Sequence, residues 1–461
     1  MSNKGQSGKR ASFSGKIGYV LAVAGSAVGL GNIWRFPYLA AKYGGGIFLL
    51  VYLILTVTFG YVLIMSETAL GRMTRKSPVG AYQTFGKTKS FKIGGWLNAV
   101  IPMLIVPYYS SIGGWVIKYL VEYLKGNVQT VAQDGYFTEF ISDSFQVEAW
   151  FIVFAVLVFC VILAGVENGV ERVSKIMMPI LVILAVIVAI YSVTRPGAIE
   201  GVKYFLIPNP KHFSAMTVVA AMGQMFYSLS IAMGILYTYG SYIGKDVDLE
   251  KSTTQVEIFD TAIAMLAGLM IIPAVYTFMG TEGMSAGPGL MFVSLPKVFY
   301  SMGTVGRVIG ILFFVLAGFA ALTSCISVLE SITANCMELF HTERKKTTRV
   351  LSVIYLIATA VIALGYSVFY VEVALPNGST GQLLDIMDYI SNSFMMPFIS
   401  LLSAILIGWI MKPSWIAEEM ELNGKKFKRK KLYNVMMRYI MPVIMMILFL
   451  QSTGVLNLIM K

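Results

Sequence analysis

The run AGSAVGLGNIWRFP, residues 24–37, lies inside an apolar stretch, 17–42, that is long enough to cross a hydrocarbon layer of ~30 Å. It carries Gly25, Gly29 and Gly31 within seven residues. Each glycine costs roughly 1 kcal/mol relative to alanine inside a helix. We therefore expect a membrane-spanning helix that unwinds near its middle.

A second weak point is QMFYSLSIAMG, residues 224–234, where Ser228, Ser230 and Gly234 occupy the middle of the sixth apolar stretch. In lipid, irregular backbone is tolerated only where it lines a cavity or binds something. Interruptions at corresponding positions of two halves indicate a transporter of inverted repeats, with its binding site at the midplane. The alternative is that the glycines only let helices pack closely.

The composition predicts that the whole chain is an all-α polytopic membrane protein. Of 461 residues, 57% are hydrophobic and 13% are charged, whereas soluble domains carry about 25% charged residues. No connection exceeds about 20 residues, so we expect no soluble domain of any size. The apolar stretches predict eleven spans, at 17–42, 46–71, 93–124, 147–165, 168–194, 214–242, 254–281, 305–338, 348–371, 382–411 and 434–459.

Cysteine and histidine usage argues against an enzyme or a metalloprotein. The three cysteines and two histidines are scattered, which fits neither a disulfide framework nor a zinc site. We find no cluster of nucleophiles or cofactor ligands at the predicted interfaces, so we expect no catalytic residues.

Basic residues predict the orientation in the membrane. The net charge of +12 comes from short blocks between apolar stretches, at 72–92, 344–349 and 425–431, whereas the loop 125–148 is acidic. We interpret these blocks as topology signals facing the cytoplasm and expect lipid, not nucleic acid, as the surrounding partner. A cytoplasmic N-terminus and eleven spans put the C-terminus outside the cell membrane.

With both interrupted segments in view, the chain resembles the neurotransmitter:sodium symporter family, specifically its bacterial amino-acid transporters. The runs GLGNIWRFPY, GGG at 44–46 and GQMFYSLS carry the resemblance, which covers essentially the whole chain. It implies a leucine-transporter type fold, in which five-plus-five inverted repeats have broken helices 1 and 6, plus one accessory helix. The common pattern has two accessory helices, so the oligomeric state stays open. The implied parts are a cytoplasmic tail at 1–16, repeats at 17–194 and 214–411, and the accessory helix at 434–461.

The resemblance implies two sodium sites. The first matches Ala27, Asn32, Ser228 and Asp260, completed by the substrate carboxylate, and the second matches Gly25, Val28, Ala320, Thr323 and Ser324.

Asp260 departs from the many relatives that carry asparagine there. A carboxylate inside the membrane costs roughly 2.5 to 3.5 kcal/mol at a helix centre, so its presence calls for a cation. Chloride-dependent relatives bind the anion at positions matching Tyr52, Gln224, Ser228, Asp260 and a serine where this chain has Ala264. We expect the fixed charge of Asp260 to replace that anion, so that chloride is not required.

The implied substrate is an amino acid. Relatives that carry monoamines place an aspartate at the position of Gly29, whereas glycine leaves room for a carboxylate beside sodium. That carboxylate would meet the N–H groups of Leu30 and Gly31, at a half-helix end whose dipole favours anions, and the Tyr109 hydroxyl. The uncharged pocket predicts a neutral hydrophobic or aromatic substrate. The implied substrate residues are Ala27, Gly29, Leu30, Gly31, Ile105, Tyr109, Phe226, Tyr227, Ser228, Ser230, Met233, Cys325 and Val328.

Two gates complete the implied mechanism, which is sodium-coupled symport into the cell by alternating access. Arg35 is expected to pair with Asp388 on the outer side. On the inner side, the implied latch joins Arg10 with Glu338 and Tyr242.

Two alternatives stay open. In a proton-coupled amino-acid permease of the same fold, a lysine of the fifth span such as Lys175 would replace the second sodium. A membrane sensor would bind an amino acid without moving it.

Overall fold

Apolar helices make up most of the computed structural model, which describes residues 11–86, 88–280, 289–376 and 380–455. Among these residues, nine unbroken helical segments are long and apolar enough to cross a membrane. Their helices are α3 (Gly46–Leu55) with α4 (Tyr61–Thr74), α6 (Lys89–Lys125), α9 (Ser144–Ala164), α10 (Arg172–Val193), α14 (Leu249–Met279), α16 (Gly303–Phe340), α17 (Arg344–Ala363), α18 (Leu383–Asp388) with α19 (Met396–Ile405), and α21 (Lys430–Val435) with α22 (Met441–Ser452).

Shorter elements connect these spans and lie at their ends. An antiparallel pair, β1 (Val373–Ala374) and β2 (Thr380–Gly381), precedes α18. The short helices are α5 (Pro78–Phe85), α7 (Val128–Val131), α8 (Tyr136–Ser142), α11 (Ala198–Leu206), α15 (Leu295–Ser301) and α20 (Ser414–Met420).

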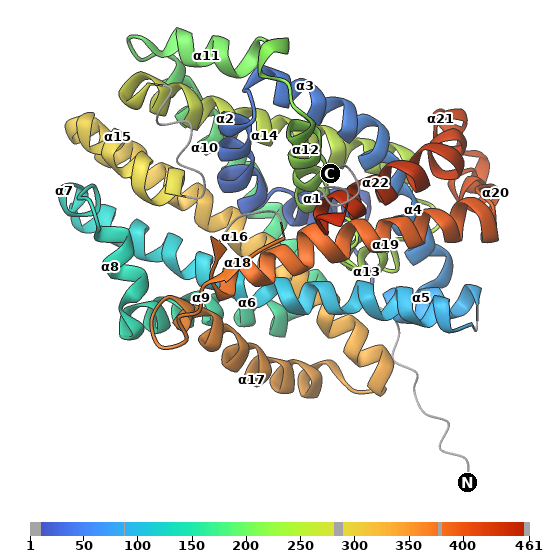
Figure 1. The fold of residues 1–461 in the computed structure, drawn as a ribbon. Coiled ribbons are helices and arrows are strands. Elements are labelled where there is room, and N and C mark those ends of the chain that lie inside the picture. Colours follow the sequence, from blue (N-terminus) through green and yellow to red (C-terminus); the bar gives the residue numbers. More distant parts are fainter. Residues whose placement is uncertain (1–10, 87, 281–288, 377–379, 456–461) are drawn as a thin grey trace.

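The first predicted break is present. Helix α1 (Lys16–Ala27) and the segment Gly31–Lys42, which ends in α2 (Phe36–Lys42), form a pair bent by 44°. Helix α1 lies in the middle of the bundle, packed against α10, α14 and α16 (Figure 1). The glycine-rich run therefore interrupts a helix at the centre of the molecule.

The second predicted break is also present, between α12 (Ala215–Ser228) and α13 (Ile235–Gly240). Ser230, Ala232 and Gly234 have positive φ angles of 55°, 62° and 71°. A non-glycine residue seldom adopts such a φ, and the conformation costs free energy that the surroundings must offset.

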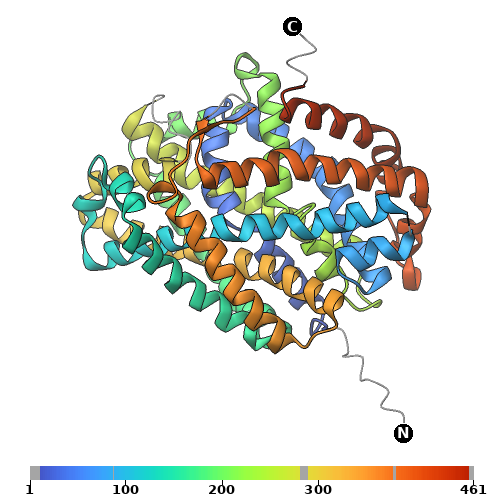
Figure 2. The same ribbon diagram turned by 60° about the horizontal axis from the view of Figure 1, so that its bottom comes forward.

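The nine segments and the bent pair give up to ten candidate spans among the described residues. The helices α12 and α13 are each too short to count by the same measure, but they lie where the sixth span was predicted, so the polytopic helical fold class is confirmed. The ninth span, predicted at 348–371, is observed at Arg344–Tyr366. The observed span starts earlier than the predicted one because its first turn is basic, and a prediction from hydropathy leaves a charged turn out of the span. Figure 2 shows the first described residues at the lower side of the molecule and the end of α22 at the upper side, as an odd number of crossings requires.

Candidate functional site

The two breaks contact each other. The hydroxyls of Ser26 and Ser230 lie 3.0 Å apart, and Gln224 Nε2 donates to the carbonyl of Gly31 at 2.8 Å. The breaks therefore form one polar centre inside an apolar bundle. Ser26 was not among the predicted site residues, because nothing in the sequence distinguishes it from a packing serine.

Two of the residues predicted for the first sodium site, Asn32 and Ser228, contact a third, Asp260. Its buried carboxylate accepts hydrogen bonds from Asn32 Nδ2 at 2.8 Å, Ser228 Oγ at 2.8 Å and the Tyr52 hydroxyl at 3.1 Å. Within the described residues, Asp260 pairs with no basic side chain. A buried carboxylate without a cationic partner is costly, so these oxygen-rich surroundings fit a bound cation.

The second predicted ion site lies where α1 meets α16. Ser324 Oγ donates to the carbonyls of Ser26 at 3.0 Å and Gly25 at 3.3 Å. Thr323 Oγ1 donates to carbonyls of its own helix, including Ala320 at 3.3 Å. These contacts thus connect Ser26 with four of the five predicted positions, which are Gly25, Ala320, Thr323 and Ser324. The fifth, Val28, is buried and donates its N–H to the Ala24 carbonyl.

A small cavity of about 20 Å³ lies between the breaks. Most of the predicted substrate residues line it, together with Ser26 and Ser324, and none of the lining side chains is charged. The lining residues are Ser26, Ala27, Gly29, Gly31, Ile105, Tyr109, Tyr227, Ser230, Met233, Ser324 and Val328.

Four predicted substrate residues do not line this cavity. The N–H of Leu30 donates to the Tyr109 hydroxyl at 2.9 Å, and Ser228 contacts Asp260. Phe226 lines a separate hollow. The Cys325 thiol lies 3.4 Å from Ser110 Oγ, because one residue further along a helix points about 100° away from Ser324.

Gly29 has no space for a side chain. A Cβ built there would lie 2.3 Å from Ser324 Oγ and 2.6 Å from the Tyr109 hydroxyl. Because glycine has no side chain, Ser324 and Tyr109 can approach the backbone of residue 29 closely.

The predicted outer gate residues lie next to the cavity. The Arg35 guanidinium is 4.0 Å from the Asp388 carboxylate and 5.1 Å from the centre of the Tyr227 ring. Arg35, Asp388 and Phe226 line a hollow of about 390 Å³. Since Tyr227 lines the cavity, these contacts lie between the cavity and the hollow.

The predicted inner latch stays a prediction, because Arg10 lies outside the described residues. Among the described contacts, the Tyr242 hydroxyl donates to Glu330 at 2.7 Å, and Glu330 also pairs with Arg344. Glu338 accepts a hydrogen bond from the backbone N–H of Ser77 at 2.7 Å. The sequence signal for Glu330 was its position as a carboxylate inside a span, but its partner Arg344 lies beyond the turn that ends α16.

Lys175 does not approach the second ion site. Its ammonium pairs with Glu171 at 2.6 Å and lies 3.1 Å from Ser14 Oγ. Two other residues of α10, Ser174 and Met178, approach Gly25, where a Cβ would lie 3.2 Å from Ser174 Oγ and 3.4 Å from Met178 Sδ.

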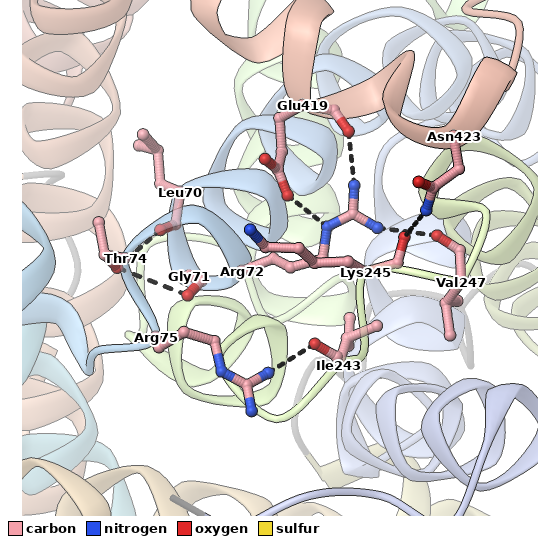
Figure 3. A network of polar contacts seen from close by, with 10 residues as sticks. All are labelled: Leu70, Gly71, Arg72, Thr74, Arg75, Ile243, Lys245, Val247, Glu419 and Asn423. Atoms are coloured by element: carbon pink, nitrogen blue, oxygen red, sulfur yellow. Dashed lines mark hydrogen bonds and ion pairs between the residues drawn. The ribbon is translucent and has the colours of Figure 1, made fainter.

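A buried arginine joins three segments of the chain (Figure 3). Arg72 of α4 donates to the side chain and the carbonyl of Glu419, each at 2.5 Å, and to the Val247 carbonyl at 2.8 Å. Arg75 donates to the Ile243 carbonyl at 2.7 Å. These contacts fix the loop that follows α13.

Comparisons with known proteins find relatives that cover almost the whole chain. The profile of the Sodium:neurotransmitter symporter family matches residues 10–139 and 122–459. An uncharacterized sodium-dependent transporter, YhdH of Bacillus subtilis (strain 168), is 34% identical over 97% of this chain and 99% of its own length. The sodium- and chloride-dependent GABA transporter 2 of Rattus norvegicus is 26% identical over 90% of this chain and 75% of its own. The crystal structure of MhsT in complex with L-phenylalanine superposes with a TM-score of 0.87 at 35% identity, covering 96% of this chain and all of that one.

Proposed function

Because the chain belongs to the sodium:neurotransmitter symporter family, and is thus a sodium-dependent multi-pass membrane transporter and not an enzyme, we propose that it moves a neutral hydrophobic or aromatic L-amino acid into the cell. Two sodium ions would accompany the substrate by alternating access, without chloride. The observation that carries the proposal is the buried Asp260 carboxylate, which has no basic partner among the described residues and lies beside an uncharged cavity.

The cavity supports the amino-acid class. Ile105, Met233 and Val328 offer apolar surface to a side chain, whereas backbone groups and hydroxyls from the two breaks surround the other part. A charged side chain such as that of lysine or glutamate would lose its hydration without gaining a partner. The relative MhsT is crystallised with L-phenylalanine, which is of the proposed class.

Chloride independence rests on the position of the fixed charge. The hydroxyls of Tyr52 and Ser228 both point at the Asp260 carboxylate. A negative oxygen therefore already occupies the place where these donors would meet an anion. The named rat relative depends on chloride, so we expect this chain to differ from it.

Two ions supply enough driving force for uptake. Each sodium crossing 100 mV contributes about 2.3 kcal/mol, and a tenfold concentration ratio adds about 1.4 kcal/mol. Two ions therefore provide roughly 7 kcal/mol, which corresponds to a limiting substrate gradient near 10⁵.

The proposed orientation puts the N-terminus in the cytoplasm and the C-terminus outside the cell membrane. Two of the basic blocks contact neighbouring elements: Arg72 contacts Glu419, which lies shortly before the block 425–431, and Glu250 accepts from the backbone of Lys428 and Arg429 within that block. Positive charge gathered at one membrane face favours the cytoplasmic side.

Uptake into proteoliposomes tests the function. We expect radiolabelled L-phenylalanine or L-leucine to accumulate with external sodium, but not with lithium or choline, and equally well when gluconate replaces chloride. Accumulation driven by a proton gradient without sodium would favour the permease alternative. Binding without flux into sealed vesicles would favour a sensor, and preferential uptake of lysine or glutamate would contradict the substrate class.

Changing Gly29 to alanine is expected to weaken substrate binding by about ten- to a hundredfold. The new methyl group would clash with Ser324 Oγ and the Tyr109 hydroxyl, and overpacking of this kind costs about 1–3 kcal/mol. Scintillation proximity binding at saturating sodium measures the effect. Gly223→Ala is the matched control, because a Cβ there meets nothing within 4 Å. Equal affinity in the two variants would argue against this cavity as the substrate site.

A further inference from the structure

A long apolar groove lies on the outside of the bundle, away from the transport site. Its volume is about 400 Å³, and three helices form its walls. Helix α17 contributes a face of residues spaced three or four apart, α16 contributes a stripe from Leu329 to Phe340, and α6 contributes Met103, Val106 and Pro107. Such spacing puts the side chains on the facing surface of each helix.

The groove opens toward the hydrocarbon of the membrane. Phe340, Val350 and Ile354 are exposed by 67%, 54% and 56% of their surfaces and form part of its lining. On a spanning helix, exposed aliphatic side chains of this kind face acyl chains. The groove is therefore accessible to acyl chains of the membrane as well as to water.

The length of the groove matches one leaflet. Along α17 it extends from Lys346 to Ala358, which corresponds to about 18 Å at 1.5 Å per residue. Half of a hydrocarbon layer of ~30 Å is about 15 Å. One acyl chain aligned with the helix would fill the groove from the polar boundary to the middle of the bilayer.

The part of the groove far from Lys346 is apolar even though it contains a tyrosine. Tyr355 is buried, and its hydroxyl turns inward to donate to Ser110 Oγ at 2.6 Å. Its ring therefore forms part of the wall while its polar atom is satisfied on the far side. Nothing polar at this end requires water.

The other end carries an unpaired positive charge. Lys346 lines the groove, is exposed, and forms no ion pair within the described residues, in contrast to Arg344, which pairs with Glu330. A lysine at the membrane boundary attracts anionic headgroups. The charge thus lies where the phosphate of a lipid in the groove would lie.

We propose that this groove binds one anionic phospholipid, with an acyl chain between α6, α16 and α17 and its phosphate at Lys346. The inference requires only that the chain spans a membrane. The groove is about one leaflet long, apolar along its length, and positive at one end.

Native mass spectrometry of the purified transporter, titrated with phosphatidylglycerol or phosphatidylcholine, tests the proposal. We expect one retained phosphatidylglycerol per chain and weaker retention of phosphatidylcholine. Lys346→Glu should lower phosphatidylglycerol occupancy by about five- to tenfold, whereas Lys345→Glu, an equal charge change on an exposed residue outside the groove, should not. Equal losses in the two variants would overturn the proposal, because they would indicate unspecific surface attraction.

A second pair of variants tests the apolar part. Val350→Trp fills the groove, whereas Val353→Trp adds the same bulk at a residue that is 57% exposed and lies outside it. We expect only Val350→Trp to displace the lipid while sodium-driven uptake confirms that both variants fold. Full lipid retention by Val350→Trp would overturn the proposal, and so would a change in its oligomeric state, because the groove would then hold a second copy of the chain.

Discussion

Replacing Asp260 with alanine is expected to abolish sodium-driven uptake and to weaken sodium binding by about 10²- to 10³-fold. The carboxylate is buried and accepts hydrogen bonds from Asn32, Ser228 and Tyr52. Its removal would take away one acceptor from each of these three donors and would leave the proposed cation without its fixed counter-charge. Breaking a buried charge pair costs about 3–5 kcal/mol. Sodium titration of amino-acid binding in detergent measures the change directly.

Asp260→Asn separates the charge from the shape. Asparagine keeps one oxygen acceptor but removes the negative charge, so the Tyr52 and Ser228 hydroxyls could then bind an anion. We expect uptake by this variant to be stimulated by chloride, and more strongly when Ala264→Ser is added. The unmodified protein should be indifferent to chloride. A strict chloride requirement in the unmodified protein, or undiminished sodium affinity in Asp260→Ala, would contradict the proposed role of this residue.

The breaks themselves were predictable, but the means of stabilising them was not. Gly25, Gly29 and Gly31 weaken the first span by intrinsic propensity alone. The second break needs positive φ at Ala232, a residue that disfavours it, and the structure offsets the cost through Glu67, whose carboxylate accepts the Ala232 N–H at 2.9 Å. Because Glu67 lies on α4, far away in sequence, no local pattern could pair it with Ala232.

Residues of one helix show the same limit. Cys325 was predicted to line the substrate pocket, whereas the cavity is lined by its neighbour Ser324. The Tyr242 hydroxyl contacts Glu330, a carboxylate of α16 that was not among the predicted site residues. Neighbouring residues on a helix differ by about 100° in direction, and residues eight apart differ by about 80° and lie about 12 Å apart along the axis. The choice depends on the rotation and depth of α16 within the bundle, which tertiary packing determines.

Arg72→Ala is expected to lower the unfolding temperature by roughly 3–5 °C. Arg72 is 1% exposed and donates to the Glu419 side chain, the Glu419 carbonyl and the Val247 carbonyl. Its loss would leave the largely buried Glu419 carboxylate without its cation, at a cost of about 3–5 kcal/mol. At about 2.1 cal/mol/K per residue, a chain of 461 residues changes by about 1 °C per kcal/mol. Thermal unfolding of the purified protein, followed by intrinsic fluorescence, measures the shift.

Arg75→Ala is the matched control, because Arg75 lies at the end of the same helix and is exposed, and within the described residues its side chain makes one hydrogen bond, to the Ile243 carbonyl. An exposed arginine of this kind contributes about 0–1 kcal/mol, so the two variants should differ clearly. Equal shifts would mean that burial of Arg72 adds nothing to the thermal stability.

The Arg72 contacts reach the loop that follows α13, which is one half of the second broken span. Arg72→Ala should therefore also let that half move more easily. We therefore expect faster proteolysis near residues 243–247 in this variant than in Arg75→Ala, and saturating sodium with substrate should slow that cleavage only if the loop moves together with the site.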